Sequence, residues 1–409
     1  MSADSTPTSI GPFEVLEWPN QPGATGHAQH SATHEQVFIK QEWFQPLAHE
    51  ALTLQAAAGG IGIPALHWLE NINDKDVVLM EPYGLTLEET FHQSGRYFGM
   101  QIILNFASQL LSRVQFIHSR NIVHGNLSPW SFALGVGWQN QQLILVDFHT
   151  ESKGKGAIND LQAIIKIIAY LYDGAECWED YQIGSAPPFI TSFQQVLSSK
   201  SNVIDYESLH GILLNMRRGL VEHLAIALDL TGPRAIQDGS SPNLGALSLL
   251  KTSEIFNCLN VALRDTGEVV TSQSALPSTL VQLFEDILDM YLVLLVRDRP
   301  SVKKQTYQLG AYHLPHRLWR DIRWILETTT DNTLYLALNA QAYRLMSALY
   351  EIRTNDQLFW VECLLSLSRA RKSVEPDCGK AAWIQTSFYW QGVMNKLMAN
   401  QNLQAGLGK

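Results

Sequence analysis

The chain has 409 residues, of which 46% are hydrophobic and 17% are charged, and its formal net charge is −10. A chain of this length can bury two or three cores, and eleven Trp residues argue against long disordered segments. The negative charge argues against broad attraction to nucleic acids or anionic membranes. We therefore expect a folded protein whose partners include neither nucleic acid nor membrane.

The cysteines and the apolar segments bear on the compartment. The chain has four cysteines with neither CxxC pairing nor even spacing, namely Cys177, Cys258, Cys363 and Cys378. The most apolar window, LVQLFEDILDMYLVLLV, carries Glu285, Asp286 and Asp289, which a membrane span would exclude, so a buried helix is predicted there. No signal peptide is recognisable. These features predict an intracellular protein, cytoplasmic or nuclear, with reduced cysteines.

The first 80 residues read as short β runs separated by turns. Residues 1–10 are predicted to be a flexible tail, and residues 20–35 a loop because of their Gly, Pro and Asn content. Strands are predicted for three segments, FEVLEW, QVFIKQEW and DVVLM, with one helix over LAHEALTLQAAA. This order predicts a small sheet with one helix packed on it.

After Tyr83 the pattern changes to helix. Apolar residues at helical spacing predict an amphipathic helix from Met100 to His118, two short β runs around NIVHG and QLILVDF, and a buried helix over AIIKIIAYLY. Three more helices are predicted near the C-terminus, at Leu334–Tyr350, Gln357–Arg371 and Ala381–Ala399. The last hundred residues therefore read as a helical region.

Four segments in chain order resemble the casein kinase 1 group of protein kinases: AHEALTLQAAAGGIGIPALHW, VVLMEPYGLTLEETF, LSRVQFIHSRNIVHG and LILVDF. The Gly-Gly-x-Gly-Ile-Pro run at Gly59–Pro64 is especially characteristic, and His-Gly at His124 resembles the vaccinia-related kinases of that group. The match covers roughly Phe13 to Gly174. It implies an α+β, bilobal fold with a tail (1–10), a small lobe (11–84), a large helical lobe (85–310) and a helical extension (311–409).

The resemblance also implies roles for three residues. Lys40 falls on the lysine that holds nucleotide phosphates, Glu50 on the helix glutamate that pairs with it, and Asp147 on the metal-binding aspartate of D-F-G. A residual ATP site is therefore one expectation for these residues. The alternative is a solvated strand lysine and a helical glutamate that faces water.

The catalytic loop that the resemblance implies lacks its chemical groups. Protein kinases have H-R-D-x-x-x-x-N there, whereas here Gly125, Asn126 and Ser131 follow His124 in the Arg, Asp and Asn places, and Ser128 replaces the loop lysine. An amide such as that of Asn126 cannot act as a base near neutral pH, and the Ser131 hydroxyl is too short to replace the Asn ligand of magnesium. The loop is therefore predicted to be catalytically degenerate.

Two further kinase features are missing from the sequence. Only Gly23 and Gly26 lie between the first two predicted strands, in the wrong frame for a phosphate-covering G-x-G-x-x-G loop. About a dozen residues separate Asp147 from Asp160, which falls on the anchoring aspartate of the central helix, so the activation segment is predicted to be drastically shortened. The fold-bearing residues of the loop persist and are predicted to pack it against the large lobe: His124, Leu127, Pro129 and Phe132.

These losses predict a pseudokinase that acts as a scaffold or allosteric regulator, with no catalytic residue, no metal and no required cofactor. The alternative is an ATP-binding enzyme with weak or non-standard phosphoryl or nucleotidyl transfer. A third reading places the function in residues 310–409, whose helices carry five Trp residues: Trp319, Trp324, Trp360, Trp383 and Trp390. Such residues more often form a core than a contact surface, yet this extension is the expected protein-binding part. A metal site at His27, His30 and His34 is the alternative to an ordinary polar loop, which is the preferred interpretation.

Overall fold

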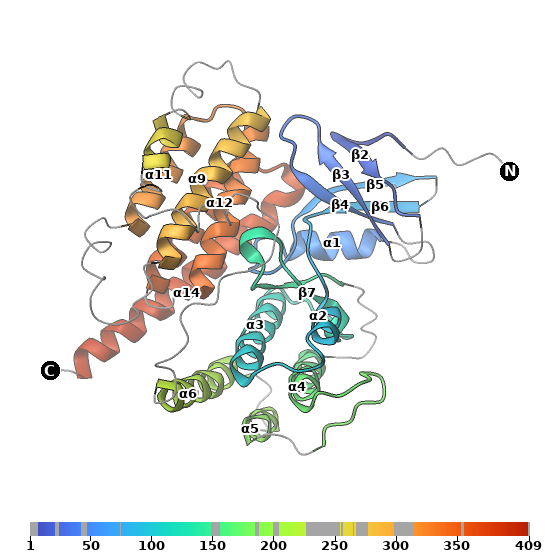
Figure 1. The fold of residues 1–409 in the computed structure, drawn as a ribbon, viewed down its shortest axis with the longest axis vertical. Helices are drawn as coiled ribbons and strands as arrows, with labels where there is room; N and C mark the ends of the chain where they lie inside the picture. Colours follow the sequence, from blue (N-terminus) through green and yellow to red (C-terminus); the bar gives the residue numbers. More distant parts are fainter. Residues whose placement is uncertain are drawn as a thin grey trace. The chain divides into compact units, whose positions relative to one another are not determined.

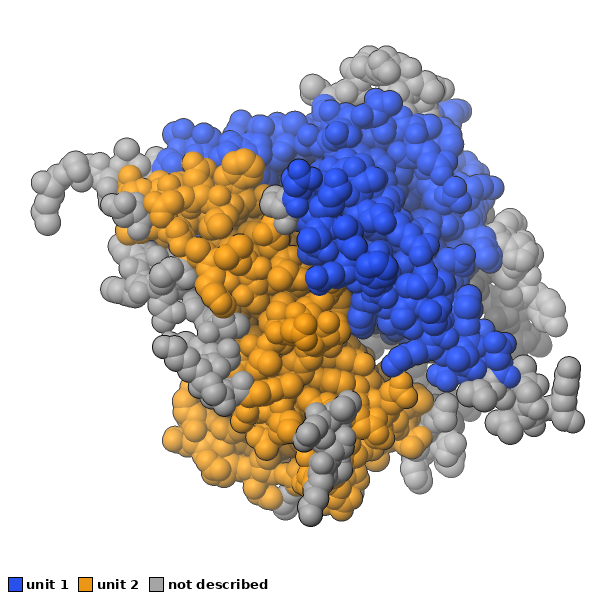
Figure 2. Space-filling model, turned by 180° about the vertical axis from the view of Figure 1, so that it is seen from behind, with its two compact units in different colours: residues 1–40, 237–409 blue, residues 41–236 orange. Residues whose placement is uncertain are grey.

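The structure is a computed structural model that describes residues 7–20, 24–41, 47–73, 75–148, 156–184, 188–198, 204–225, 254, 257–264, 266, 277–297, 314–352 and 356–407. The predicted α+β class is confirmed, with a β-rich N-terminal region and a larger helical part (Figure 1). Internal contacts divide the chain into unit 1, residues 1–40 and 237–409, and unit 2, residues 41–236 (Figure 2). This division reflects which residues contact one another most and does not test the four expected regions. Their boundaries at residues 10, 84 and 310 stay predictions.

Unit 1 begins with four antiparallel strands in the order β1-β2-β3-β4. They are β1 (Ser9–Ile10), β2 (Phe13–Glu17), β3 (Thr25–His30) and β4 (Gln36–Gln41). In β4, Val37 and Ile39 are fully buried, whereas Lys40 lies on the opposite face beside Thr25 of β3. This alternation is the two-residue period of a strand with one buried face.

Two N-terminal predictions need correction. The predicted loop over residues 20–35 is wrong, because residues 25–30 of it form β3. Gly26 occupies a strand position where a Cβ atom would lie 2.5 Å from the carbonyl oxygen of Glu17, so this glycine marks a close backbone approach and not a turn. The tail expected over residues 1–10 also ends earlier, since Ser9 and Ile10 pair with β2 and Ile10 is buried.

The helices of unit 1 pack in chain order. They are α9 (Pro277–Arg297), α11 (Leu314–Thr328), α12 (Asn332–Ile352), α13 (Gln357–Val374) and α14 (Asp377–Leu407). Helix α9 packs on α11 and α12, and α13 packs on α12 and α14. The three predicted C-terminal helices are confirmed as α12, α13 and α14. Among the described residues, no helix is long and apolar enough to cross a membrane.

Polar contacts connect the helices and strands of unit 1. Asp321 of α11 accepts hydrogen bonds from the Tyr291 hydroxyl of α9 and from the Arg320 guanidinium, whose Nε lies 3.0 Å from Oδ1. Arg344 of α12 donates at 2.9 Å to Glu35, which directly precedes β4. The C-terminal helices therefore hold the N-terminal strands of the same unit through an ion pair that is largely shielded from water.

Unit 2 combines two short hairpins with helices. Its strands are β5 (Leu66–Ile72) with β6 (Lys75–Met80) and β7 (Phe132–Leu134) with β8 (Leu143–Leu145), each pair antiparallel. Its helices are α1 (Ala48–Ala56), α2 (Leu87–Gln93), α3 (Met100–Ser119), α4 (Ala157–Asp173), α5 (Pro188–Leu197) and α6 (Tyr206–Ala225). Helix α3 packs against both α4 and α6, and α5 packs against α4 and α6 (Figure 1).

The Gly59–Pro64 run connects α1 to this core. Gly62 has φ +68°, and its carbonyl oxygen accepts a hydrogen bond from Leu145 of β8 at 2.8 Å. A Cβ atom at Gly62 would lie 2.2 Å from Nε of Arg113, which is buried and donates to the Leu143 carbonyl oxygen at 2.9 Å. The run therefore needs glycine for backbone conformation and for space.

We expect Gly62→Ala to destabilise the protein by at least about 1–3 kcal/mol, since the left-handed backbone alone has this cost and Arg113 must also be displaced. Gly99→Ala is the matched control, because φ is −63° there and nothing lies within 4 Å of the added Cβ. Urea unfolding followed by circular dichroism measures both changes. Equal effects of the two substitutions would contradict this explanation of the run.

Candidate functional site

The loop from His124 to Ser131 is anchored through its backbone by one buried carboxylate, that of Asp160. Asp160, in the first turn of α4, accepts hydrogen bonds from the backbone N–H groups of His124 at 2.8 Å and Gly125 at 2.7 Å. His118, at the end of α3, contacts the same carboxylate through Nε2 at 2.9 Å, and its Nδ1 bonds to the Tyr206 hydroxyl. Asp160 therefore performs the anchoring role predicted for it.

This arrangement sets the protonation of Asp160. Burial alone would raise the pKa of this carboxyl, but hydrogen bonds from His118, Gly125 and His124 outweigh burial and hold the pKa below its ordinary value of 3.8. The carboxylate is therefore ionised at neutral pH. An ionised Asp160 can accept all three hydrogen bonds at once.

The His124 ring ties the loop to the segment that carries Asp147. Its Nε2–H donates to the backbone carbonyl oxygen of Asp147, and its Nδ1 accepts from the N–H of Asn126 at 3.3 Å. His124 is fully buried, as are Leu127 and Phe132. Pro129 is buried as well. The burial of these four residues agrees with the prediction that they are structural members of the loop, and the large lobe against which they were expected to pack stays a prediction.

The degenerate positions play structural roles or face solvent. Ser131 is fully buried, and its Oγ accepts from the N–H of Ser128 at 3.1 Å and lies 3.3 Å from the Ser128 hydroxyl. The Asn126 side chain is exposed. Ser131 and Ser128 thus hydrogen-bond to each other within the loop. Among the described contacts, neither hydroxyl bonds to a carboxylate or an imidazole that could take its proton. The predicted β run around NIVHG is wrong, since Asn121 has φ +57° and the loop amides bond to Asp160.

The three residues expected at a nucleotide site are distributed over the two units. Lys40 belongs to β4 in unit 1, whereas Glu50 of α1 and Asp147 belong to unit 2. Glu50 is buried with 3% exposure, so the alternative of a glutamate that faces water is wrong. The pairing of Lys40 with Glu50 stays a prediction. Helix α4 begins at Ala157, so only residues 148–156 separate it from Asp147.

Tyr83, which the sequence did not single out, lies beside these acids. Its ring packs on a small apolar cluster of unit 2 formed by Ala133, Ile144 and Val146. Burial, followed by the charges of Glu50, Asp147 and Glu89, raises the pKa of Tyr83 to about 12. The phenol is therefore neutral and near both acids that the resemblance places at the nucleotide site.

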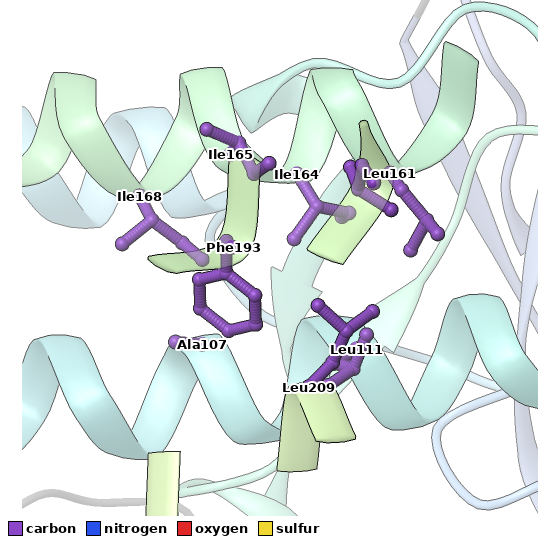
Figure 3. A pocket seen from close by; sticks show the side chains of 9 residues that line it. Ala107, Leu111, Leu161, Ile164, Ile165, Ile168, Phe193 and Leu209 are labelled. Atoms are coloured by element: carbon purple, nitrogen blue, oxygen red, sulfur yellow. The ribbon is translucent and has the colours of Figure 1, made fainter. Parts of the chain in front are cut away.

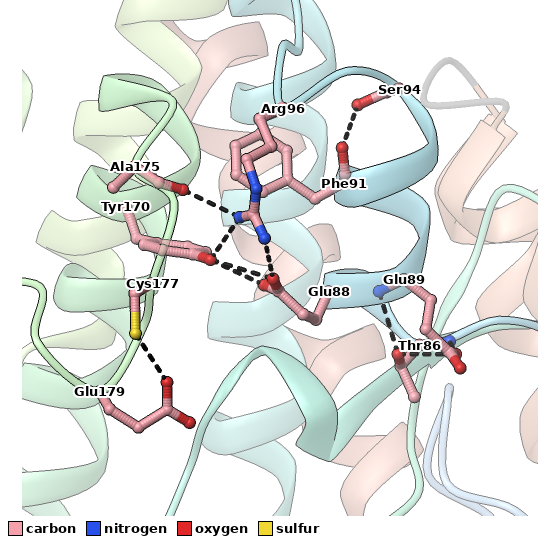
Figure 4. Close-up of polar contacts among 10 residues, drawn as sticks. All are labelled: Thr86, Glu88, Glu89, Phe91, Ser94, Arg96, Tyr170, Ala175, Cys177 and Glu179. Carbon is pink, nitrogen blue, oxygen red and sulfur yellow. Dashed lines mark hydrogen bonds and ion pairs between the residues drawn. The ribbon is translucent and has the colours of Figure 1, made fainter.

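A buried polar network joins α2 to α4 (Figure 4). Arg96, at φ +56°, donates to the Tyr170 hydroxyl at 2.7 Å, to the Ala175 carbonyl oxygen at 2.9 Å and to Glu88 at 2.9 Å. Tyr170 and Glu88 are themselves hydrogen-bonded at 3.0 Å. The sequence signal here was local: Thr86 and Glu89 form a reciprocal capping box at the start of α2. The long-range partners carry no such signal.

An apolar pocket lies among α3, α4, α5 and α6 (Figure 3). The side chains in the view point toward one another, with Phe193 facing Ile165, Ile168 and Ala107. Its cavity volume is about 10 Å³, which is at the lower limit of the space that holds one water molecule. This space is a packing defect of the helical core, and none of the predicted site residues lines it.

The three histidines weighed as a metal site lie in and beside β3. His30 accepts at Nδ1 from the N–H groups of Ala32 and Thr33, both at 3.2 Å, and its ring packs edge-on against Phe13. His27 packs edge-on against Phe38. Among the described residues, no group of three His, Cys, Asp or Glu side chains comes together as a metal site requires.

Some aromatic residues of the C-terminal helices are buried in the core of unit 1, and others are exposed on its surface. Trp360, Trp383 and Trp390 are buried, whereas Trp324 is 41% exposed. On α14, Ile384 and Phe388 are also exposed, Phe388 to 71%. Cys177, Cys258 and Cys363 are free thiols.

No protein-family model matches the chain.

Proposed function

We propose that this chain is a catalytically inactive, protein kinase-like protein of the casein kinase 1 group that acts as a protein-binding scaffold or allosteric regulator. One observation carries the proposal. The loop from His124 to Ser131 is held by Asp160 through its backbone, while the residues in the Asp and Asn places, Asn126 and Ser131, offer no base and no metal ligand. Such a loop keeps a shape without its chemistry.

The size of the chemical loss supports an inactive protein. General-base and positioning groups each contribute about 10²–10⁴ to a rate, and Asn126 cannot take a proton. Ser131 is turned into the loop by its bond to Ser128, so its hydroxyl is unavailable to a second metal ion. The short connection from Asp147 to α4 leaves only residues 148–156 for a segment that docks peptide substrates in active kinases.

The protein-binding part of the proposal rests on unit 1. Ile384 and Phe388 are one turn apart on α14 and therefore share a face of the helix, and both are exposed. An exposed aromatic beside an exposed aliphatic side chain is the composition of an interface centre. We assign partner binding to the C-terminal helices on this ground.

Phosphate transfer from γ-labelled ATP, with magnesium and casein as the acceptor, tests the proposal. We expect the full chain to incorporate no more label than the Lys40→Ala variant or a protein-free blank. Lys40→Ala is the control because Lys40 is the residue that would hold the phosphates in an active enzyme. Magnesium-dependent incorporation that Lys40→Ala abolishes would contradict the proposal.

The retention of Glu50 and Asp147 favours a second candidate function, ATP binding with weak or non-standard phosphoryl or nucleotidyl transfer. Both acids remain in unit 2, and Glu50 is buried. A kinase-like fold does not by itself dictate the reaction. Transfer of an adenylyl group, followed with α-labelled ATP, would distinguish this candidate from the scaffold.

A further inference from the structure

The space beside Glu50 and Asp147 already contains an aromatic ring. Tyr83 packs on Ala133, Ile144 and Val146, and Val146 directly precedes Asp147 in the chain. The two carboxylates are near enough to the phenol for their charges to act on it. The apolar floor under this ring is the kind of lining that a site for a planar, nucleobase-sized ligand would have.

The backbone holds Tyr83 in this position from both sides. Before it, the N–H of Glu81 donates to the Ala65 carbonyl oxygen at 2.9 Å, and the Glu81 carboxylate accepts from the N–H of Ala65 at 3.1 Å. After it, the N–H of Gly84 donates to the Leu134 carbonyl oxygen in β7 at 2.7 Å. These hydrogen bonds restrain the backbone on both sides of Tyr83, and its ring packs on the apolar cluster.

β7 continues this attachment beyond Gly84. The N–H of Leu134 donates to the Leu85 carbonyl oxygen at 2.8 Å, and Thr86 pairs with Ala133 as an antiparallel bridge. A Cβ atom at Gly84 would lie 3.3 Å from the Leu134 oxygen, a close approach that brings the chain down onto β7. The same strand thus supplies the floor, through Ala133, and the restraint on the residue that covers it.

We propose that Tyr83 is an internal plug: its ring occupies the apolar floor of Ala133, Ile144 and Val146 and excludes planar heteroaromatic ligands of the purine nucleoside class. Removal of the ring uncovers a pocket over this apolar floor, whose Val146 directly precedes Asp147 in the chain. This inference rests on the proposed function, because the resemblance is what identifies Glu50 and Asp147 as former nucleotide-site residues. The proposed function already explains why phosphate transfer is lost. The plug adds a physical reason why nucleotide binding is lost as well.

The experiment compares binding of adenosine and of magnesium-ATP to the wild type and four full-length variants by isothermal titration calorimetry. Tyr83→Ala removes the plug, and Tyr83→Leu removes the ring while keeping apolar packing. Tyr83→Phe keeps the ring without the hydroxyl. Tyr97→Ala is the matched control, because Tyr97 is a 76% exposed tyrosine of the same unit.

We expect Tyr83→Ala to bind adenosine at least tenfold more tightly than the wild type, with a smaller gain for Tyr83→Leu. Tyr83→Phe and Tyr97→Ala should match the wild type, which should show no binding at millimolar adenosine. Wild-type binding as tight as that of Tyr83→Leu overturns the plug even if Tyr83→Ala fails to fold. Equal absence of binding in the wild type, Tyr83→Leu and a folded Tyr83→Ala also overturns it.

Phosphate transfer measured in the same proteins separates this inference from the proposed function. Binding without transfer in Tyr83→Ala supports both the plug and the inactive loop. Binding with transfer supports the plug and contradicts the inactive loop. Transfer by the wild type contradicts both, since an occupied site could not turn over.

Discussion

Asp160→Asn should lower the free energy of unfolding by about 3–5 kcal/mol, which is the cost of breaking a buried charged network by removing one partner. The asparagine keeps the shape of the side chain but offers a single acceptor oxygen in place of two. At least one of the His124 and Gly125 amides then loses its partner and faces an N–H₂ group. Guanidinium unfolding followed by far-ultraviolet circular dichroism measures the change.

Asp180→Asn is the matched control for this prediction, since Asp180 is an exposed aspartate of the same unit. A surface substitution of this kind should change stability by no more than about 0.5 kcal/mol. If the two variants lose equal stability, Asp160 does not anchor the loop. The control also removes one negative charge, so a difference between the variants cannot be a net-charge effect.

The same carboxylate predicts a pH dependence. The folded-state pKa of Asp160 lies below its ordinary value of 3.8, so on acidification the unfolded chain binds this proton first. The stabilisation is therefore present above pH about 4 and is lost as the pH falls through the folded-state pKa. The acid side of the stability profile should be flatter in Asp160→Asn than in the wild type. Profiles of equal slope would contradict the assignment.

Trp360→Ala should destabilise unit 1 by about 3–5 kcal/mol, the usual cost of a large cavity in a core. Trp360 of α13 is fully buried and its ring packs edge-on against Phe359 at 5.0 Å. Trp324→Ala is the matched control, because Trp324 of α11 is 41% exposed and loses much less burial. Thermal unfolding by calorimetry measures both. Similar losses would show that the interior of the C-terminal helices is not the core described here.

The long helices could be predicted because their signal is local and periodic. The helix predicted at Met100–His118 appears as α3, and the prediction at Gln357–Arg371 appears as α13 with the same first residue. Strand β5 has no such signal. Four consecutive residues of β5 are exposed, so its sequence lacks the alternation by which a half-buried strand is recognised.

The glycines show a second limit. Gly26 lies within the loop predicted over residues 20–35, and yet it is a strand residue whose single hydrogen permits close approach of the Glu17 carbonyl oxygen. Gly62 belongs to a characteristic run, and the physical reason for a glycine there is the buried Arg113. In both cases the cause is a neighbour whose identity a composition-based reading cannot supply.

The sequence could predict those residues of the candidate site that belong to motifs. It could not predict residues such as Tyr83, which occupies the space beside them. The residues of the loop and its anchor Asp160 followed from the resemblance, and their hydrogen bonds agree with the roles predicted for them. Tyr83 had no motif to mark it, because its contacts with Ala133 and Val146 are about fifty to sixty residues away in the sequence. The Arg96–Tyr170 contact likewise joins distant segments.

The most direct test of the central claim is a crystal structure of the full-length protein grown with millimolar magnesium-ATP. The claim is that the loop from His124 to Ser131 in unit 2 keeps the shape of a phosphate-transfer loop, while the protein binds no nucleotide there. We predict that Tyr83 still covers Ala133 and Val146 and that no triphosphate lies beside Asp147. A triphosphate with two metal ions at Asp147, next to a carboxylate that replaces the missing base at Asn126, would contradict the claim.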